Sequence, residues 1–375
     1  MSKRIYIIAG EASGDLHGSN LMKALQAEAT DITFRFWGGD RMNALSGGLV
    51  KHIRDLAFMG FLEVIKNLRT ILGNIRFCKE DIEAFKPDAL VLIDYPGFNL
   101  RIAEWAHEKG IPVYYSISPQ VWAWKESRIK KIKKNVDHMF VILPFEKAFY
   151  ANHGMEVEYV GHPLLDAIEQ YEETETVRIE IFREKHGLND RPIIALLPGS
   201  RKQEIEIKLP IMLEAARKYE DFNIVVAGAP TITDEFYDRF LSTEDVLSKD
   251  DTYALLSNAE YALVTSGTAT LETALFGVPE VVCYKGSSIS YAIAKRLVKI
   301  KYISLVNLIM DKLLVTELIQ HDCTPSKIRR ELDLLINDQE HRSELKNGYK
   351  RLREKLGGGG ASKKVAQSLL KSISE

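Results

Sequence analysis

The 375-residue sequence lacks the marks of several large classes of protein. Its three cysteines, Cys78, Cys283 and Cys323, lie far apart and have no partner at metal-ligand spacing, which argues against structural zinc and for a reducing compartment. No apolar run approaches the ~18 residues that a membrane span needs. The first apolar run, Ile5–Ala9, is too short for a signal peptide, so we expect a cytosolic protein.

The sequence also lacks an excess of charge of one sign. Its formal net charge is −2, so the chain as a whole has no attraction to nucleic acid, and any basic surface must be local. The apolar and charged fractions, 46% and 27%, are ordinary for a globular protein. Because single cores stop growing near 250–300 residues, the length predicts two domains.

Two nucleotide-binding motifs and one metal motif are missing as well. The stretch Gly10–Asp15 follows a strand pattern and is rich in glycine, yet it matches neither G-x-G-x-x-G nor a Walker loop. No Asp-x-Asp occurs anywhere, so the commonest carboxylate clamp for a metal-bound diphosphate is absent. We therefore predict no metal and no cofactor, with helix dipoles and basic side chains left to bind any anion.

What is present is a regular alternation of buried strand patterns and helical patterns, which predicts α/β domains with parallel, doubly wound sheets. The predicted strands are Ile5–Ala9, Thr33–Trp37, Ala89–Asp94, Val113–Ile117, His138–Leu143, Val157–Val160, Ile193–Leu197, Asn223–Ala227, Tyr261–Thr265 and Glu280–Tyr284. The first helix is expected at Ser19–Glu28, after a turn.

A hinge is predicted at Gly161–Thr176, which ends in an acidic run without a strand pattern. The tail is expected to form one helix over Pro325–Lys355, a break at Gly357–Gly360 and a last amphipathic helix at Ala361–Ile373. We accordingly expect domains at 1–165 and 166–355, with 356–375 packing back on the first domain or on a partner subunit. Ligands of paired sheets of this kind bind at the carboxyl ends of the strands.

The stretch Ile193–Glu204 predicts a strand, a tight turn at Pro198-Gly199 and a helix. This arrangement directs backbone N–H groups and the positive end of a helix at an anion, and Arg201 in the turn adds a fork that fits phosphate oxygens. An ordinary strand-to-helix loop with exposed basic residues is the plainer interpretation.

A second loop of this kind is Thr265–Glu272, which is rich in small hydroxyl residues. Ser266, Thr268 and Thr270 could bind phosphate oxygens beside the amino end of the helix, and Glu272 could accept from ribose hydroxyls. Helix capping is the alternative explanation. Two such loops in one half of the chain favour a diphosphate site.

In the first half, Asp94 ends a predicted strand, where a general base of a parallel sheet is well placed. It could equally cap the helix that follows.

Three stretches combine apolar or aromatic residues with Lys and Arg, at Phe58–Leu72, around Trp122–Lys134 and at Ser288–Leu305. Together they favour contact with an anionic bilayer over the alternative of core packing with a solvated basic edge. Use of the lysine run for RNA is another alternative, but no RNA-binding module accompanies it.

Several of these motifs resemble those of the lipid A disaccharide synthases, which form glycosyltransferase family 19. The matching motifs run in order along the chain: GEASGD (Gly10–Asp15), MGFLEV (Met59–Val64), IDYPGFNLR (Ile93–Arg101), SPQVWAW (Ser118–Trp124), VGHPLLD (Val160–Asp166), LLPGSRKQEI (Leu196–Ile205), SGTATLE (Ser266–Glu272), Asn307-Leu308 and LGGGGASKKVA.

The resemblance implies two facing Rossmann-like domains with a cleft between them, the GT-B architecture. It implies an inverting transfer that joins UDP-2,3-diacylglucosamine to 2,3-diacylglucosamine 1-phosphate through a β(1→6) bond and releases UDP. The enzyme would work at the cytoplasmic face of the inner membrane, to which it binds peripherally. A homodimer is a further expectation, because the family's last helices can exchange between protomers.

By the same resemblance, Asp94 and Arg201 are the catalytic residues. Where that motif often carries a second Asp, this chain has Gly97. The remaining predicted site residues fall in three groups: for UDP, Gly199, Ser200, Arg201, Ser266, Gly267, Thr268, Glu272 and Asn307; for the acceptor loop, Gly10, Glu11, Ser13, Gly14 and Asp15; for acyl chains and membrane, Phe58, Met59, Phe61, Leu62, Val64, Ile65, Leu68, Trp122 and Trp124. The alternatives are another UDP-sugar enzyme of this architecture, such as a UDP-GlcNAc 2-epimerase, and a non-catalytic nucleotide-binding scaffold.

Overall fold

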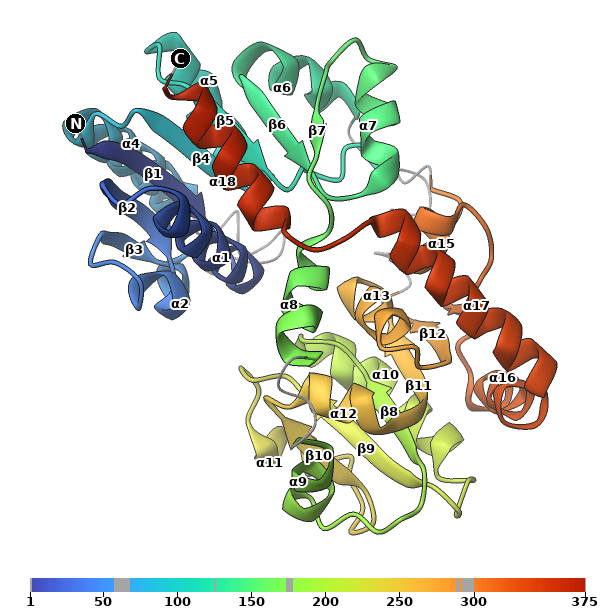
Figure 1. Ribbon diagram of the computed structural model, residues 1–375. Helices are drawn as coiled ribbons and strands as arrows, with labels where there is room; N and C mark the ends of the chain where they lie inside the picture. Colours follow the sequence, from blue (N-terminus) through green and yellow to red (C-terminus); the bar gives the residue numbers. More distant parts are fainter. Residues whose placement is uncertain are drawn as a thin grey trace. The chain divides into compact units, whose positions relative to one another are not determined.

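The computed structural model describes residues 2–56, 68–124, 126–172, 178–287, 291 and 300–374. It divides into two compact units (Figure 1). Unit 1 consists of Met1–Asp166 and Gly359–Glu375, and unit 2 of Ala167–Gly358. The chain therefore passes from unit 1 to unit 2 and returns to unit 1 at its end. The first crossing lies inside a helix, α8 (Pro163–Glu172).

Unit 1 contains a seven-stranded parallel sheet with the order β3-β2-β1-β4-β5-β6-β7. Its strands are β1 (Lys3–Ala9), β2 (Ile32–Gly38), β3 (Leu49–His52), β4 (Ala89–Ile93), β5 (Val113–Ser116), β6 (His138–Val141) and β7 (Glu158–Tyr159). Its helices are α1 (Ala12–Glu28), α2 (Asp40–Asn43), η1 (Ile53–Asp55), α4 (Leu68–Phe85), α5 (Pro96–Glu108), η2 (Glu126–Arg128), α6 (Ile129–Asn135), α7 (Pro144–Ala151) and α18 (Ala361–Ser372).

The central strand β1 is apolar along its whole buried length because helices cover both faces of the sheet. Tyr6 and Ile8 belong to one buried cluster, which includes residues of α4 and α5. Ile5 and Ile7 belong to another, which includes residues of α1 and α18. A strand that is buried on both faces needs a continuous apolar run instead of an alternating one, as the sequence has.

The last helix of the chain is part of the core of unit 1. Ala361, Val365, Ala366 and Leu369 of α18 are buried in the same cluster as residues of α1, and the two helices are in contact (Figure 1). The start of α18 is held by Asp166, whose carboxylate accepts from the backbone N–H of Gly360 at 2.5 Å and of the next two residues.

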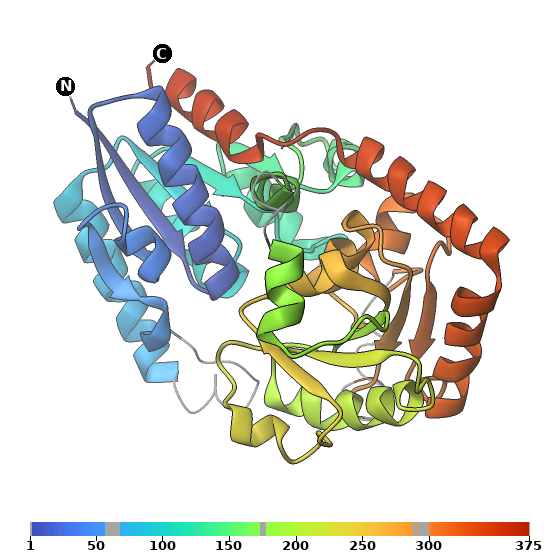
Figure 2. The same cartoon turned by 60° about the horizontal axis from the view of Figure 1, so that its bottom comes forward.

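Unit 2 contains a six-stranded parallel sheet with the order β10-β9-β8-β11-β12-β13. Its strands are β8 (Ile193–Leu197), β9 (Asn223–Gly228), β10 (Val246–Lys249), β11 (Ala259–Thr265), β12 (Glu280–Tyr284) and β13 (Thr316–Ile319). Its helices are α9 (Arg178–Lys185), α10 (Lys202–Ala216), α11 (Asp234–Tyr237), α12 (Thr252–Asn258), α13 (Thr268–Leu275), α15 (Leu305–Met310), α16 (Pro325–Asn337) and α17 (Gln339–Leu356). Figure 2 shows α16 and α17, in orange and red, along one side of this unit.

The prediction of doubly wound parallel sheets is confirmed, and each of the ten predicted strands is present. Three strands were missed, namely β3, β10 and β13. All three are four-residue strands at an edge of their sheet, where a half-exposed position leaves only a weak apolar pattern.

The single helix expected over Pro325–Lys355 was wrong, because Asp338 interrupts it. Its side chain accepts from the His341 backbone N–H at 2.9 Å and caps α17.

The turn expected before Ser19 was also wrong, since α1 begins at Ala12, directly after β1. The glycines of this stretch allow close packing. A Cβ at Gly14 would lie 3.2 Å from the Cβ of Ala9, and one at Gly18 would lie 2.5 Å from the Met42 sulfur. Glycine in the first turn of α1 therefore lets this helix pack closely on β1.

Among the described helices, none combines the length and the apolar character that crossing a bilayer requires. The apolar stretch predicted at Phe58–Leu72 falls mostly in residues 57–67, outside the described residues. The same holds for most of Ser288–Leu305.

We predict that Glu280→Gln stabilises the protein at neutral pH. Glu280 is 2% exposed, and within the described chain neither carboxylate oxygen has a hydrogen-bond partner. Burial, with a contribution from the Glu317 carboxylate, raises the pKa of Glu280 well above its usual value. When folding raises the pKa of an acid, the protein loses stability as the pH rises from the unfolded-state pKa of that acid towards its folded-state pKa.

Glutamine has the same shape and no proton to lose, so it removes this pH dependence. Thermal unfolding should therefore show a Tm for Glu280→Gln about 2–4 °C above wild type at pH 7–8, a difference on the order of 1 kcal/mol. Near pH 3, where the acid is protonated in both states, the two Tm values should converge. A variant that is less stable than wild type at pH 8 would contradict this account.

Candidate active site

In each sheet, the strand order reverses at one central pair of strands, so the chain connections run to opposite sides of that pair. Ligands of doubly wound sheets bind at the carboxyl ends of such a pair. The pair is β1 and β4 in unit 1, and β8 and β11 in unit 2. The predicted site loops all follow these four strands. Each unit therefore presents its candidate residues at the carboxyl edge of its sheet, at the same topological position.

In unit 2 the structure brings the two predicted loops together around one pocket of about 470 Å³. The lining residues are Leu197, Gly199, Ser200, Arg201, Glu204, Ala227, Gly228, Ala229, Pro230, Thr252, Thr265, Ser266, Gly267, Thr268, Ala269 and Glu272. All the residues predicted to bind UDP except Asn307 belong to this set. The pairing of β8 with β11 explains the juxtaposition, because it places the loop after each strand beside the other.

The first loop is shaped by Gly199, which has a φ of 116°. A side chain at this position would collide with the carboxylate of Glu204, which folds back over the turn. Arg201 caps α10, and its Nη1 atom lies 3.3 Å from Oε1 of Glu204. The amino end of α10, with its N–H groups and its dipole, therefore lies at the pocket together with the guanidinium of Arg201, whose side chain is 64% exposed.

The second loop turns at Gly267, which has a φ of 132°, and α13 begins at Thr268. Two of its hydroxyls are engaged with backbone carbonyl groups. Ser266 donates to Ile303 at 2.8 Å, and Thr270 donates to Gly267 at 2.9 Å. Thr268 is exposed, so its hydroxyl and the amino end of α13 are the groups most accessible to an anion.

Glu272 lies one turn into α13 and lines the pocket. Its Oε1 atom accepts from the hydroxyl of Tyr253 at 3.4 Å. Burial raises the pKa of Glu272, and the Tyr253 hydroxyl opposes that rise. A partly desolvated carboxylate at the side of the pocket is suited to accept from a hydroxyl-rich ligand such as a sugar.

Asn307 does not line this pocket, and its side chain has no free hydrogen-bonding capacity. It is fully buried; Nδ2 donates to the carbonyl of Val315 at 2.9 Å and to Glu317 at 2.8 Å, while Oδ1 accepts from the N–H groups of Leu314 and Val315. In this structure the side chain therefore has a structural role, and its direct contact with UDP stays a prediction.

That role is to fix the turn on which the second loop rests. Glu317 accepts from Asn307 and from the backbone N–H groups of Ile303 and Ser304. The carbonyl of Ile303 in turn accepts from Ser266. A buried amide and a carboxylate thus hold the pocket wall from behind.

In unit 1 the central residue is Asp94, directly after β4 and next to Gly10 at the end of β1. Asp94 and Tyr95 have positive φ values of 41° and 49°, which non-glycine residues seldom adopt. The carbonyl of Asp94 accepts from Nδ2 of Asn99 at 2.7 Å and from the hydroxyl of Tyr115 at 2.6 Å. Two buried side chains thus hold the unusual backbone that directs the carboxylate.

The surroundings of Asp94 favour its neutral form. Burial raises its pKa to about 6, and the nearby carboxylate of Glu11 adds to the rise. Gly10 allows this crowding, because a side chain there would collide with the ring of Tyr95. A carboxyl group with a pKa near the working pH is suited to general base catalysis.

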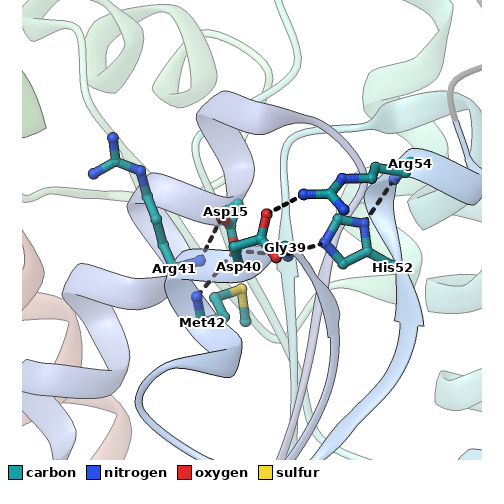
Figure 3. A network of polar contacts seen from close by, with 7 residues as sticks. All are labelled: Asp15, Gly39, Asp40, Arg41, Met42, His52 and Arg54. Carbon is teal, nitrogen blue, oxygen red and sulfur yellow. Dashed lines mark hydrogen bonds and ion pairs between the residues drawn. The ribbon is translucent and has the colours of Figure 1, made fainter. Parts of the chain in front are cut away.

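The other residues of the predicted acceptor loop serve different purposes. Ser13 is exposed, whereas Gly14 is buried against β1. Asp15 is 5% exposed and accepts from the backbone N–H groups of Gly39, Arg41 and Met42 at 2.7–3.1 Å (Figure 3). Its carboxylate therefore holds α2 against α1, and the expected contact with the acceptor through this side chain stays a prediction.

Of the residues predicted to contact acyl chains, Phe58, Met59, Phe61, Leu62, Val64 and Ile65 and the side chain of Leu68 lie outside the described residues. Trp122 is half-buried, and its indole N–H donates to Glu146 at 3.2 Å. Trp124 is 41% exposed, and the guanidinium of Arg128 lies 5.6 Å from its ring centre.

Three parts of the pocket in unit 2 were missed from the sequence. Ala227–Pro230, at the end of β9 and just after it, and Thr252, the first residue of α12, also line it, and no motif in the sequence marks them. Lys208 lies behind it, 2% exposed, in contact with Thr265 and Glu204. A signal for Lys208 did exist, because a lysine on the apolar face of a predicted helix is unusual.

Comparison with known proteins gives three concordant results. The family model described as lipid-A-disaccharide synthetase matches residues 5–371. A lipid-A-disaccharide synthase of Trichlorobacter lovleyi is 38% identical, over 100% of this chain and 98% of that protein. One of Syntrophus aciditrophicus is 40% identical, over 99% and 98%.

Solved structures with similar folds are more distant in sequence. The UDP-GlcNAc 2-epimerase of Neisseria meningitidis, bound to UDP-GlcNAc, has a TM-score of 0.69 and 17% identity, covering 98% of this chain and 100% of that one. A calicheamicin glycosyltransferase has a TM-score of 0.59 and 14% identity, with full coverage of both chains. At these identities the likeness shows the fold alone, which is the predicted GT-B class.

We predict that Asp94 titrates near pH 6 and that Glu11→Gln lowers this value. Removing a neighbouring negative charge favours the ionised form of Asp94, so its pKa must fall towards the usual value for Asp. The measurement is a ¹³C NMR titration of the labelled carboxyl, assigned with Asp94→Asn. Glu108→Gln, at the exposed far end of α5, is the matched control and should leave the titration unchanged. An Asp94 midpoint that does not move in Glu11→Gln would contradict the stated coupling.

Proposed function

The chain belongs to the lipid-A-disaccharide synthetase family, and from this premise we propose that the edges of its two sheets hold the two substrates of one glycosyl transfer. The family is that of an enzyme of lipid A biosynthesis, a glycosyltransferase. The donor is UDP-2,3-diacylglucosamine, bound in the pocket of unit 2. The acceptor is 2,3-diacylglucosamine 1-phosphate, whose 6-hydroxyl is deprotonated by Asp94. The products are the β(1→6)-linked disaccharide 1-phosphate and UDP.

The observation that carries this assignment is the unit 2 pocket, where two helix amino ends and Arg201 surround a single space. As the bond between the anomeric carbon and the diphosphate breaks, its electron pair goes to the leaving phosphate oxygen. Fixed N–H dipoles stabilise that developing charge without reorganising, and the guanidinium of Arg201 adds its positive charge. Glu272 is positioned to accept from the ribose hydroxyls.

At the acceptor side, the proton of the attacking hydroxyl passes to the carboxylate of Asp94. Attack from the face opposite to the diphosphate inverts the anomeric centre. Asn99 and Tyr115 hold Asp94 in place by its backbone, and the raised pKa makes its carboxylate a better proton acceptor than an ordinary Asp. We propose further that the transfer needs no metal or cofactor, with Arg201 and the helix amino ends neutralising the diphosphate.

We also propose that the enzyme binds peripherally to an anionic membrane, at the cytoplasmic face of the inner membrane, where its acylated substrates reside. Support comes from the exposed Trp124 with Arg128 beside it, and from the exposed lysines of α6 that follow. Leu72 and Phe77 of α4 are also exposed apolar side chains, at 52% and 46%. Aromatic and basic residues together suit the interface of such a bilayer.

We predict that Asp94→Asn lowers kcat by about 10²–10⁴-fold without lowering Tm, because an amide has the shape of the acid but cannot accept the proton. The assay follows transfer from UDP-diacylglucosamine to a radiolabelled acceptor in mixed micelles, with Glu108→Gln as the exposed control. Wild-type turnover by Asp94→Asn would show that another group takes the proton.

We predict that Arg201→Lys keeps the fold but lowers kcat/KM for the UDP-sugar by about 10²-fold. Lysine retains the charge but cannot make the two parallel hydrogen bonds of a guanidinium to a phosphate. The same transfer assay at varied donor concentration measures this loss. Unchanged kinetics of Arg201→Lys, or equal activity with UDP-GlcNAc and the acylated donor, would contradict the proposed donor site.

A further inference from the structure

Lys208 is a buried cation directly behind the proposed diphosphate pocket. Its side chain is 3% exposed, on the inner face of α10, one helical turn after Glu204. The ammonium group donates to the hydroxyl of Thr265, a residue of the pocket wall. Its Nζ atom also lies 3.8 Å from Oε2 of Glu204, another residue of that wall.

Glu204 is shared between two cations. Its Oε1 atom faces Arg201 at 3.3 Å while its Oε2 atom faces Lys208 at 3.8 Å. The three side chains form a graded series from solvent to core, with exposed fractions of 64%, 33% and 3% for Arg201, Glu204 and Lys208. The carboxylate also lies against Gly199, so it occupies the turn of the first loop, where an anion would bind.

The charges of this trio do not balance. Burial lowers the pKa of Lys208, and the carboxylate of Glu204 opposes that fall. With Lys208 protonated, two cations face one carboxylate beside the amino end of a helix. A lysine buried to this degree is costly unless an anion lies close to it. A bound diphosphate would supply the missing negative charge, and it would draw Arg201 away from Glu204.

We propose that Lys208 is a positioning residue that acts through Glu204: it holds this carboxylate when Arg201 turns to the diphosphate of the UDP-sugar. Without Lys208, Glu204 would compete with the diphosphate for Arg201. With Lys208, the carboxylate keeps a partner in both states, and the guanidinium is released at little cost. The inference rests on the proposed diphosphate site and adds a residue to it.

The test measures UDP binding by titration calorimetry for four variants of the full chain. Lys208→Met replaces the cation by an apolar side chain of similar length, which a buried position accepts. Glu204→Gln removes the competing carboxylate, and the double variant combines both changes. Lys218→Met, an exposed cation just beyond the carboxyl end of α10, is the matched control. Uridine, which has no phosphate, serves as the second ligand.

We expect Lys208→Met to weaken UDP binding about tenfold and to leave uridine binding unchanged. Glu204→Gln should tighten UDP binding. In the Glu204→Gln background, the further change Lys208→Met should cost less than about threefold, because no carboxylate is left to be held. Lys218→Met should bind both ligands as wild type does.

Equal losses for UDP and uridine in Lys208→Met would show damage to the core and overturn the inference. So would a tenfold loss for UDP that is the same in both backgrounds, or wild-type affinity of Lys208→Met. The variant Arg201→Ala distinguishes a wrong role for Lys208 from a wrong location of the diphosphate site. If Arg201→Ala binds UDP like wild type, the diphosphate lies elsewhere and both proposals fall; if it loses affinity while Lys208→Met does not, only the role of Lys208 falls.

Discussion

The hydrogen-bonded pairing of β8 with β11 is the constraint on which the rest of the account depends. Because these strands are parallel neighbours, the loops after Leu197 and Thr265 leave the sheet side by side. Each loop leads at once into a helix, so two sets of unpaired N–H groups converge on one pocket. The pairing of β1 with β4 does the same in unit 1, where it places Gly10 and Glu11 beside Asp94. The chemistry of each unit follows from this one feature of topology.

Buried polar side chains keep these loops in shape, and several of them look like ligand contacts in the sequence. Asn307 and Glu317 support the Ser266 turn, whereas Asn99 and Tyr115 fix the left-handed backbone of Asp94. Each of these four side chains makes at least one hydrogen bond inside the protein, which offsets part of the cost of its desolvation. A site with such a scaffold presents its loops to a ligand without having to order them on binding.

Periodicity and turn residues were enough to predict the sheets, because a strand buried on both faces leaves an unmistakable apolar run. They were also enough to predict both loops of the pocket, since Pro198-Gly199 and Gly267 mark abrupt turns. Which polar residues are buried could not be predicted. Asp15 and Asn307 are buried, whereas Glu272 lines the pocket, and this difference depends on tertiary contacts. Asp15 contacts residues 24 or more positions away, and Asn307 contacts the residues that follow α15. The edge strands β3, β10 and β13 were missed because half-exposed strands leave only a weak apolar pattern.

The most direct measurement of the central claim is a crystal structure of the full chain with UDP. The account predicts diphosphate oxygens at about 3 Å from the guanidinium of Arg201 and from the first N–H groups of α13. It also predicts that the ribose lies against Glu272. A diphosphate bound away from both loops, or touching only one of them while the other faces solvent, would contradict the claim that the pairing of β8 and β11 builds the donor site.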